Sequence, residues 1–170
     1  KGIHIDLGSC SKGYALDLAL EQIKNKSIKA ALLSTKSSTI VFGKKPDGSP
    51  WQIGIEHPRN SNELIGSITL QDSEGLSTSG DYQKYFFSEG KRYHHLLNPF
   101  SGYPANDFQS LTVISSRSCL EADILSTAIF IMDKKSGWDY ILVNNIKALA
   151  VDKNGKVLIS PEMLKRFKEL

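Results

Sequence analysis

Residues 118–132 of the chain read Ser-Cys-Leu-Glu-Ala-Asp-Ile-Leu-Ser-Thr-Ala-Ile-Phe-Ile-Met, and this stretch decides the fold. One stripe of side chains recurs at helical spacing, and the other faces are apolar too, so the pattern predicts a buried helix. The stripe consists of Leu120, Ile124, Thr127 and Ile131, and Leu125, Ile129 and Phe130 lie on the other faces. Ser118 is the expected N-cap, and Glu121 lies in a first turn that favours acidic side chains.

Strand patterns occupy most of the remaining chain, and helical patterns lie at its start, late middle and end. Strands are predicted at 1–6, 30–33, 39–42, 51–55, 65–70, 85–88, 92–97, 111–114, 148–151 and 157–159, and further helices within 8–26, at 134–143 and from 160 onward. Ser9 or Ser11 is the expected N-cap of the first helix. Strands that run in blocks between helices indicate an α+β protein, a mostly antiparallel β-sheet packed with helices, and a single domain over 1–170.

The composition is that of an ordinary globular protein with one domain. Hydrophobic residues make up 40% of the 170 residues, which suffices for a sizeable core. The net charge of +3 comes from lysines spread along the chain, so nothing in it calls for nucleic acid or a membrane surface as a partner. No apolar run reaches the roughly 18–20 residues of a transmembrane segment. Cys10 and Cys119 form neither a disulfide framework nor a CxxC metal motif, and both are expected to be small buried residues.

Asp123 is the most informative single residue, because it lies in the almost wholly apolar helix. A buried carboxylate without a partner costs several kcal/mol, so we expect Asp123 to have one. Thr127 lies one turn later on the same face, and the two side chains can offer oxygens to a hard cation such as Mg²⁺. The alternative is that Asp123 caps or pairs with a neighbouring backbone N–H or a lysine.

The adjacent histidines His94 and His95 lie in a predicted strand, so they should point to opposite faces. One can then face a pocket while the other faces solvent. The alternative is one exposed and one packed histidine, neither with a chemical task.

Two segments could bind phosphate. Residues 77–82, Ser-Thr-Ser-Gly-Asp-Tyr, concentrate hydroxyls beside a glycine in a predicted loop, although an ordinary turn fits them equally well. Residues 8–13, Gly-Ser-Cys-Ser-Lys-Gly, lead into a helix N-terminus, whose N–H groups favour anions, and Lys12 adds charge. The segment is not a P-loop, because Gly-Lys-Ser/Thr is missing.

Together these segments resemble the FAD:protein FMN transferase (ApbE) family. The matching stretches are Asp6 to Asp17 (family pattern D-L-G-G-I-A-K-G-Y-A-x-D), Trp51 to Arg59 (W-x-I-G-I-x-x-P-R), Thr78 to Phe86 (T-S-G-D-Y-x-x-Y-F), Tyr93 to Gly102 (Y-x-H-I-I-D-P-x-T-G) and Ala122 to Ala128 (A-D-A-L-A-T-A). The five stretches occur in the same order as in the family, so a chance match is a poor explanation. The resemblance implies an ApbE-like core related to the T-fold, of which this chain is the C-terminal part, without the N-terminal part.

The resemblance implies Mg²⁺-dependent transfer of FMN from FAD to a Ser or Thr hydroxyl of an acceptor protein, a redox subunit, with release of AMP. The implied metal ligands are Asp123, Thr127 and the backbone oxygen of Ser11. His95 or Asp123 would act as the catalytic base. The implied FAD-binding residues are Ser9, Ser11, Lys12, Tyr14, Thr78, Ser79, Gly80 and Asp81. The resemblance also implies a periplasmic or membrane-anchored extracytoplasmic location, since many members of the family are lipoproteins.

This chain departs from the family pattern in ways that bear on function. The family's N-x-G-G-D/N loop corresponds to residues 34–38, Ser-Thr-Lys-Ser-Ser, so both glycines are replaced and Cβ atoms enter the space near the expected FAD. Ser9 replaces a glycine, and Asn98 replaces an aspartate. Two alternatives therefore stand beside the transferase, namely a non-catalytic flavin-binding or flavin-trafficking relative and an FAD pyrophosphatase.

Overall fold

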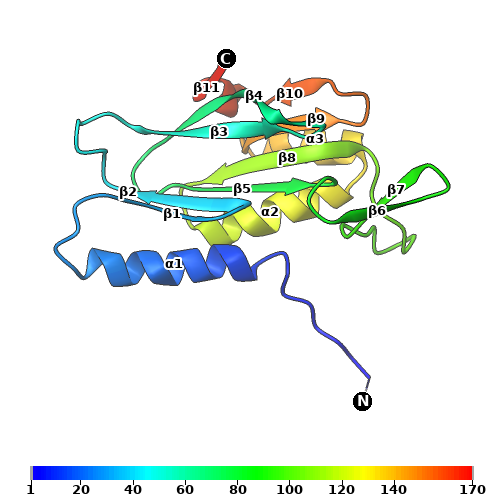
Figure 1. The fold of residues 1–170 in the computed structure, drawn as a ribbon, viewed down its shortest axis with the longest axis horizontal. Coiled ribbons are helices and arrows are strands. Elements are labelled where there is room, and N and C mark those ends of the chain that lie inside the picture. Colours follow the sequence, from blue (N-terminus) through cyan, green and yellow to red (C-terminus); the bar gives the residue numbers. More distant parts are fainter. Residues whose placement is uncertain (1, 170) are drawn as a thin grey trace.

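A computed structural model describes residues 2–169 as three layers around one six-stranded sheet (Figure 1). The sheet has the order β1-β2-β5-β8-β9-β10, and its strand pairs are antiparallel. Helices α1, α2 and α3 cover one face, and the three-stranded sheet β11-β4-β3 covers the other. Strands β6 and β7 form a separate hairpin that projects from one end of the body.

Most elements follow one another along the chain with short connections, and a longer segment, residues 95–107, joins β7 to β8. The helices are α1 (Ser11–Lys24), α2 (Cys119–Ile131), α3 (Lys134–Val143) and α4 (Pro161–Leu164). The strands are β1 (Ala31–Thr35), β2 (Ser38–Phe42), β3 (Trp51–His57), β4 (Asn60–Leu70), β5 (Gly75–Gly80), β6 (Tyr85–Ser88), β7 (Lys91–His94), β8 (Phe108–Ser115), β9 (Lys147–Asp152), β10 (Val157–Ile159) and β11 (Phe167–Glu169). None of the helices described between residues 2 and 169 has the length and apolarity needed to cross a bilayer.

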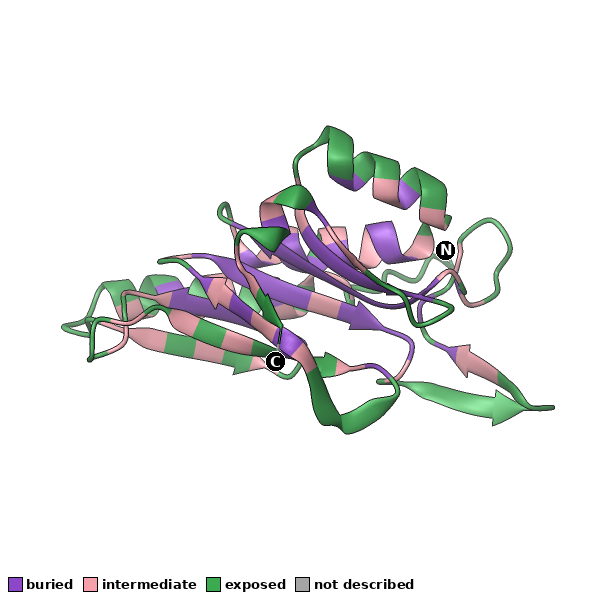
Figure 2. Ribbon diagram, turned by 90° about the horizontal axis from the view of Figure 1, so that it is seen from above, coloured by how far each residue is buried: buried purple, intermediate pink, exposed green. Residues whose placement is uncertain are grey.

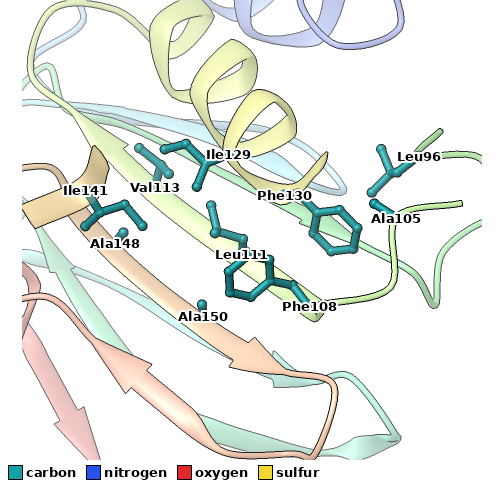
Figure 3. Packing of buried hydrophobic residues seen from close by; sticks show 10 residues of the cluster. All are labelled: Leu96, Ala105, Phe108, Leu111, Val113, Ile129, Phe130, Ile141, Ala148 and Ala150. Carbon is teal, nitrogen blue, oxygen red and sulfur yellow. The ribbon is translucent and has the colours of Figure 1, made fainter. Parts of the chain in front are cut away.

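Apolar cores on both faces of the main sheet hold the layers together, and a third, smaller cluster packs α1 on the sheet. The first lies between the main sheet and helices α2 and α3, and it includes Leu111, Ile129, Phe130 and Ile141 (Figure 3). The second lies between the two sheets and is formed by Val41, Ile55, Ile68, Leu70, Leu76, Ile114, Leu149 and Met163. Burial is concentrated in the central strands and in the helix turns that face them (Figure 2). The six-stranded sheet therefore contributes apolar side chains to both cores.

Helices α1 and α2 are joined at their N-terminal ends by exchanged carboxylates. The first backbone N–H groups of a helix have no partner inside that helix. In α2, the N–H groups of Cys119 and Leu120 donate to the two carboxylate oxygens of Asp17 in α1, at 2.8 and 2.9 Å. In α1, the N–H of Gly13 donates to Asp123 of α2 at 2.9 Å. Each helix thus caps the other.

Gly13 makes this close approach possible. A Cβ at Gly13 would lie 2.5 Å from the carbonyl oxygen of Cys119, which is backbone and cannot move aside cheaply. Gly75 of β5 lies close to the same residue. A Cβ added at Gly75 would lie 2.5 Å from the Cα of Cys119. The N-terminal turn of α2 is therefore held between two glycines.

The structure confirms most elements expected from the sequence. Helix α2 lies within 118–132, and Ser118 caps it by accepting the N–H of Glu121. The hairpin turn at Glu89 and Gly90 has positive φ at both residues, 50° and 73°, as a tight two-residue turn requires. The expected α+β class with a mostly antiparallel sheet is confirmed.

Four local predictions were wrong. Residues 77–80 are not a loop but lie in the interior strand β5, where polar side chains on one face bond to α2. Residues 2–6 form no strand, and Lys1 of that prediction lies outside the described residues. The N-cap of α1 is Cys10, without a side-chain bond, because Asp123 takes over that task. The C-terminal helix is limited to α4 and gives way to β11.

We expect Asp17→Ala to lower the free energy of unfolding by about 2 kcal/mol, because two N–H groups of α2 lose their acceptor. Urea unfolding of both proteins measures the loss. Asp139→Ala is the control, since Asp139 is an exposed helical aspartate on α3. Equal effects of the two substitutions would show that α2 does not depend on α1 for its cap.

Candidate functional site

The carboxylate of Asp123 is the centre of the site, and its burial explains its contacts. The residue is only 2% exposed. Its Oδ2 accepts the Gly13 N–H at 2.9 Å, and its Oδ1 accepts the hydroxyl of Ser77 at 3.0 Å. The hydroxyl of Ser38 lies at 3.4 Å from the same oxygen. The expectation that Asp123 must have partners is therefore confirmed.

Lys12 places a positive charge beside this carboxylate. Its Nζ lies 3.6 Å from Oδ1 of Asp123 and donates to the backbone oxygen of Gly8 at 3.1 Å. The side chain is 37% exposed, so it can also reach a ligand in solvent. Asp123 thus contacts both a backbone N–H and a lysine, the two partners that we expected if its role were only to stabilise the fold.

Thr127 lies one helical turn beyond Asp123 and is held by β5. Its Oγ1 lies 3.0 Å from Oγ of Ser79, which also lies 3.0 Å from Oγ of Ser126. Ser126 in turn donates to the backbone oxygen of Asp123 at 3.0 Å. Hydroxyl groups of β5 therefore contact both of the side chains that the sequence singled out in α2.

These residues suit a hard cation. A carboxylate offers about four acceptor positions, and the two hydrogen bonds of 3.0 Å or less to Asp123 leave others available. Thr127 adds a half-buried hydroxyl, and the backbone oxygen of Ser11 lies in the first turn of α1, next to Lys12. Within residues 2–169 no three His, Cys, Asp or Glu side chains converge. Mg²⁺ typically binds to few protein oxygens and completes its coordination shell with oxygens of water and phosphate.

The two adjacent histidines point to opposite sides, as the sequence predicts. His94 is buried, its Nε2 lies 2.7 Å from the backbone oxygen of Ala105, and its ring packs edge-on against Phe130. Burial lowers the pKa of His94 below its ordinary value. This histidine is a packed residue whose ring nitrogens both have backbone partners.

His95 is exposed and faces outward. Its Nδ1 lies 3.3 Å from the backbone oxygen of Lys84, which can only accept, so Nδ1 carries the proton and Nε2 has a free lone pair. Partial burial of the ring lowers the pKa of His95, and the charges of Lys12 and Asp6 act on it in opposite directions. His95 is therefore mostly neutral at pH 7.

Asp81 lies in a second polar cluster, apart from the contacts of Asp123. Arg59 donates to both of its carboxylate oxygens, at 2.7 and 2.6 Å, and Arg92 approaches at 3.5 Å. Arg92 also stacks on Tyr85 at 4.1 Å. These charged side chains line a cavity of about 390 Å³, together with His94.

The remaining residues that the sequence linked to FAD are dispersed. Thr78 points away from α2 and shares a hydrogen bond of 2.8 Å with Thr112 of β8. Gly80 packs against Tyr82, whose pKa burial raises to about 12. Tyr14 is exposed on α1, and Ser9 is half-buried just before it. The structure thus brings together Lys12, Ser79, Asp123 and Thr127, with Ser11 next to Lys12.

Three residues support the site in roles that the sequence did not indicate. Asp17 caps α2, and Ser38 and Ser77 contact Asp123. Asp17 is the last residue of the first family motif, and Ser77 directly precedes the third, so motif position is the signal that could have found them. Ser38 has no such signal, because it lies where the chain departs from the family pattern.

The fold and the site define an α+β protein with a buried carboxylate and hydroxyl pair, one turn apart on a helix, beside the N-terminus of a second helix. The family model described as the ApbE family matches residues 1–150. The chain belongs to the ApbE family.

Curated relatives and solved structures agree with this assignment. The chain is 34% identical, over 172 aligned positions, to an FAD:protein FMN transferase of Klebsiella pneumoniae, covering 99% of this chain and 52% of the relative. It is 35% identical to the ApbE protein of Thermotoga maritima, with a TM-score of 0.89 over 99% of this chain and 55% of that one. The flavinyl transferase ApbE of Pseudomonas stutzeri, in its apo form, is 36% identical with a TM-score of 0.82, over 96% and 52%. The chain spans about half the length of the relatives it matches.

We expect the stability of the protein to fall as the pH drops below about 6.5, in part because of His94. Burial lowers the His94 pKa, so the unfolded chain binds a proton at a higher pH than the folded protein does. As the pH falls from 6.5 to the pKa of His94 in the folded protein, this contribution to the free energy of unfolding should be lost. Above pH 7 the contribution should not change with pH. Urea unfolding of the parent and of His94→Gln over this range isolates it, because His95 is common to both. A parent and variant that lose stability in parallel would contradict the expectation.

Proposed function

We propose that the chain forms the metal-binding part of an FAD:protein FMN transferase, which moves FMN from FAD to a Ser or Thr hydroxyl of an acceptor protein. The observation that carries the proposal is the buried Asp123 with Thr127 one turn later, placed against the N-terminus of α1. Relatives that cover the chain almost completely bear the name FAD:protein FMN transferase, which supports flavinylation as the reaction.

Asp123, Thr127 and the backbone oxygen of Ser11 would hold the metal. Mg²⁺ bound there would neutralise the pyrophosphate charge and stabilise the departing AMP. The chain itself supplies a second source of positive charge. The N-terminal turn of α1 contributes the positive end of the helix dipole, and Lys12 adds an ammonium group that is 37% exposed. A diphosphate is the ligand that this combination favours.

His95 is the better candidate for the general base. In the transfer step, the acceptor oxygen bonds to the FMN phosphorus, the bond from that phosphorus to the AMP oxygen breaks, and the acceptor proton goes to a base. His95 presents a free Nε2 lone pair to solvent. Asp123 is 2% exposed and already accepts hydrogen bonds of 2.9 and 3.0 Å, so it is poorly placed to reach an acceptor hydroxyl.

One observation favours a non-catalytic flavin-binding relative as the second candidate. Lys36 has a φ of 52° in the turn between β1 and β2, at a position where the family pattern has glycine. A lysine in this conformation is strained, and its Cβ occupies space that a glycine leaves open. Binding of FAD without transfer would identify this class.

We expect FAD to bind in the presence of Mg²⁺ and to bind at least tenfold more weakly in Asp123→Ala, since the variant loses a proposed metal ligand. Calorimetry or flavin fluorescence, with and without Mg²⁺, measures both affinities. Asp139→Ala is the control for loss of a carboxylate. FAD affinity that is independent of Mg²⁺, or no binding at high micromolar FAD, would count against the proposed site.

We expect His95→Gln to slow FMN transfer by about 100-fold or more while it retains FAD binding, because it loses the base. The parent rate should fall with pH only below about 6.5, since the pKa of His95 is lowered and the base must be neutral. AMP release, followed with and without acceptor protein, measures transfer and separates it from FAD hydrolysis.

The matched control is His57→Asn, because His57 is the last residue of β3 and accepts two backbone N–H groups that an Asn oxygen can also accept. A His95→Gln rate close to that of this control would move the role of base to another group.

A further inference from the structure

Strand β5 and helix α2 are in register at the site. Alternate residues of a strand lie about 6.6–6.8 Å apart on one face, and residues one turn apart on a helix lie about 6 Å apart along its axis. The two repeats therefore match over a short distance. Ser77 meets Asp123, and Ser79 meets Thr127, in both cases with oxygen atoms 3.0 Å apart.

The direction of the hydrogen bonds at Thr127 follows from counting protons. A serine hydroxyl has one proton to donate and can accept two hydrogen bonds. The proton of Ser126 goes to the backbone oxygen of Asp123, so Ser126 accepts from Ser79. Ser79 then has no proton left, so it accepts from Thr127. The Thr127 proton points toward β5, and its oxygen lone pairs remain free.

A parallel chain of hydroxyls reaches Asp123 from β2. Ser38 and Ser77 are both fully buried, and their oxygens lie 3.0 Å apart. Because Asp123 can only accept, Ser77 donates to Oδ1 and is free to accept from Ser38. This arrangement fixes the orientation of the carboxylate at one oxygen, while Gly13 fixes it at the other.

We propose that Ser77 and Ser79 are positioning residues that set the separation and orientation of two metal-ligand oxygens, those of Asp123 and Thr127. This inference rests on the proposed function, because it assumes that a metal binds there. Mg²⁺ demands near-ideal octahedral geometry, whereas Ca²⁺ accepts flexible ligand arrangements. Groups that orient metal ligands typically contribute 10–100-fold to metal affinity. The two serines should therefore determine both the affinity for Mg²⁺ and the preference for Mg²⁺ over Ca²⁺.

The test is titration of the chain with Mg²⁺ alone and with Ca²⁺ alone by calorimetry. Ser77→Ala and Ser79→Ala should each weaken Mg²⁺ binding about tenfold or more and weaken Ca²⁺ binding much less. Ser110→Ala is the matched control, because Ser110 is a buried serine paired with Gly80 on the neighbouring strand. Within residues 2–169 its hydroxyl has no hydrogen-bond partner, so its removal should change neither affinity.

Thermal unfolding of the metal-free variants guards against a merely structural effect. Ser77→Cys and Ser79→Cys preserve the volume of the side chain but provide only a weak donor, so they should fold and still lose Mg²⁺ preference. Parent-like Mg²⁺ affinity and selectivity in the folded variants would overturn the positioning role and leave the proposed function intact. A parent that binds no Mg²⁺ at millimolar concentration would overturn both.

Discussion

The burial of the Asp123 carboxylate is the constraint on which the site depends. Removal of a charged or polar group from water is costly unless hydrogen bonds replace the lost hydration. The protein replaces it with donors from two different elements, namely the first turn of α1 and strand β5, and Ser38 of strand β2 donates in turn to the serine of β5. Each donor can reach Asp123 only if its element is in place. This buried carboxylate therefore also specifies how α1 and the central strands pack on α2.

Much of the fold could be predicted from the sequence, because apolar periodicity reports burial directly. Helix α2 and most strands follow from it. Strand β5 could not be recognised, since its serines and threonines resemble a polar loop until α2 supplies their hydrogen-bond partners. The cap of α1 was assigned to Ser9 or Ser11 for the same reason, because its real partner lies 110 residues away in the chain.

The site could be predicted in part. The need for a partner at Asp123, and the opposite orientations of His94 and His95, follow from burial and strand geometry and are confirmed. The supporting residue Ser38 could not be found, because only the tertiary structure brings it to Asp123, whereas the motif position of Asp17 was a usable signal. Residues that one motif places side by side are also separated by the fold. Ser79 contacts Thr127, whereas Asp81 pairs with Arg59 and Arg92 in a different cluster.

The exchanged carboxylates of α1 and α2 have a consequence for synthesis on the ribosome. The contacts of Asp17 and of Gly13 each join positions more than 100 residues apart. Helix α1 therefore leaves the ribosome long before the residues that complete its N-terminus have been made. Such distant contacts form slowly, because a long loop must close first. The nascent chain must consequently wait, with the N-terminal turn of its first helix uncapped, until residue 123 has been translated.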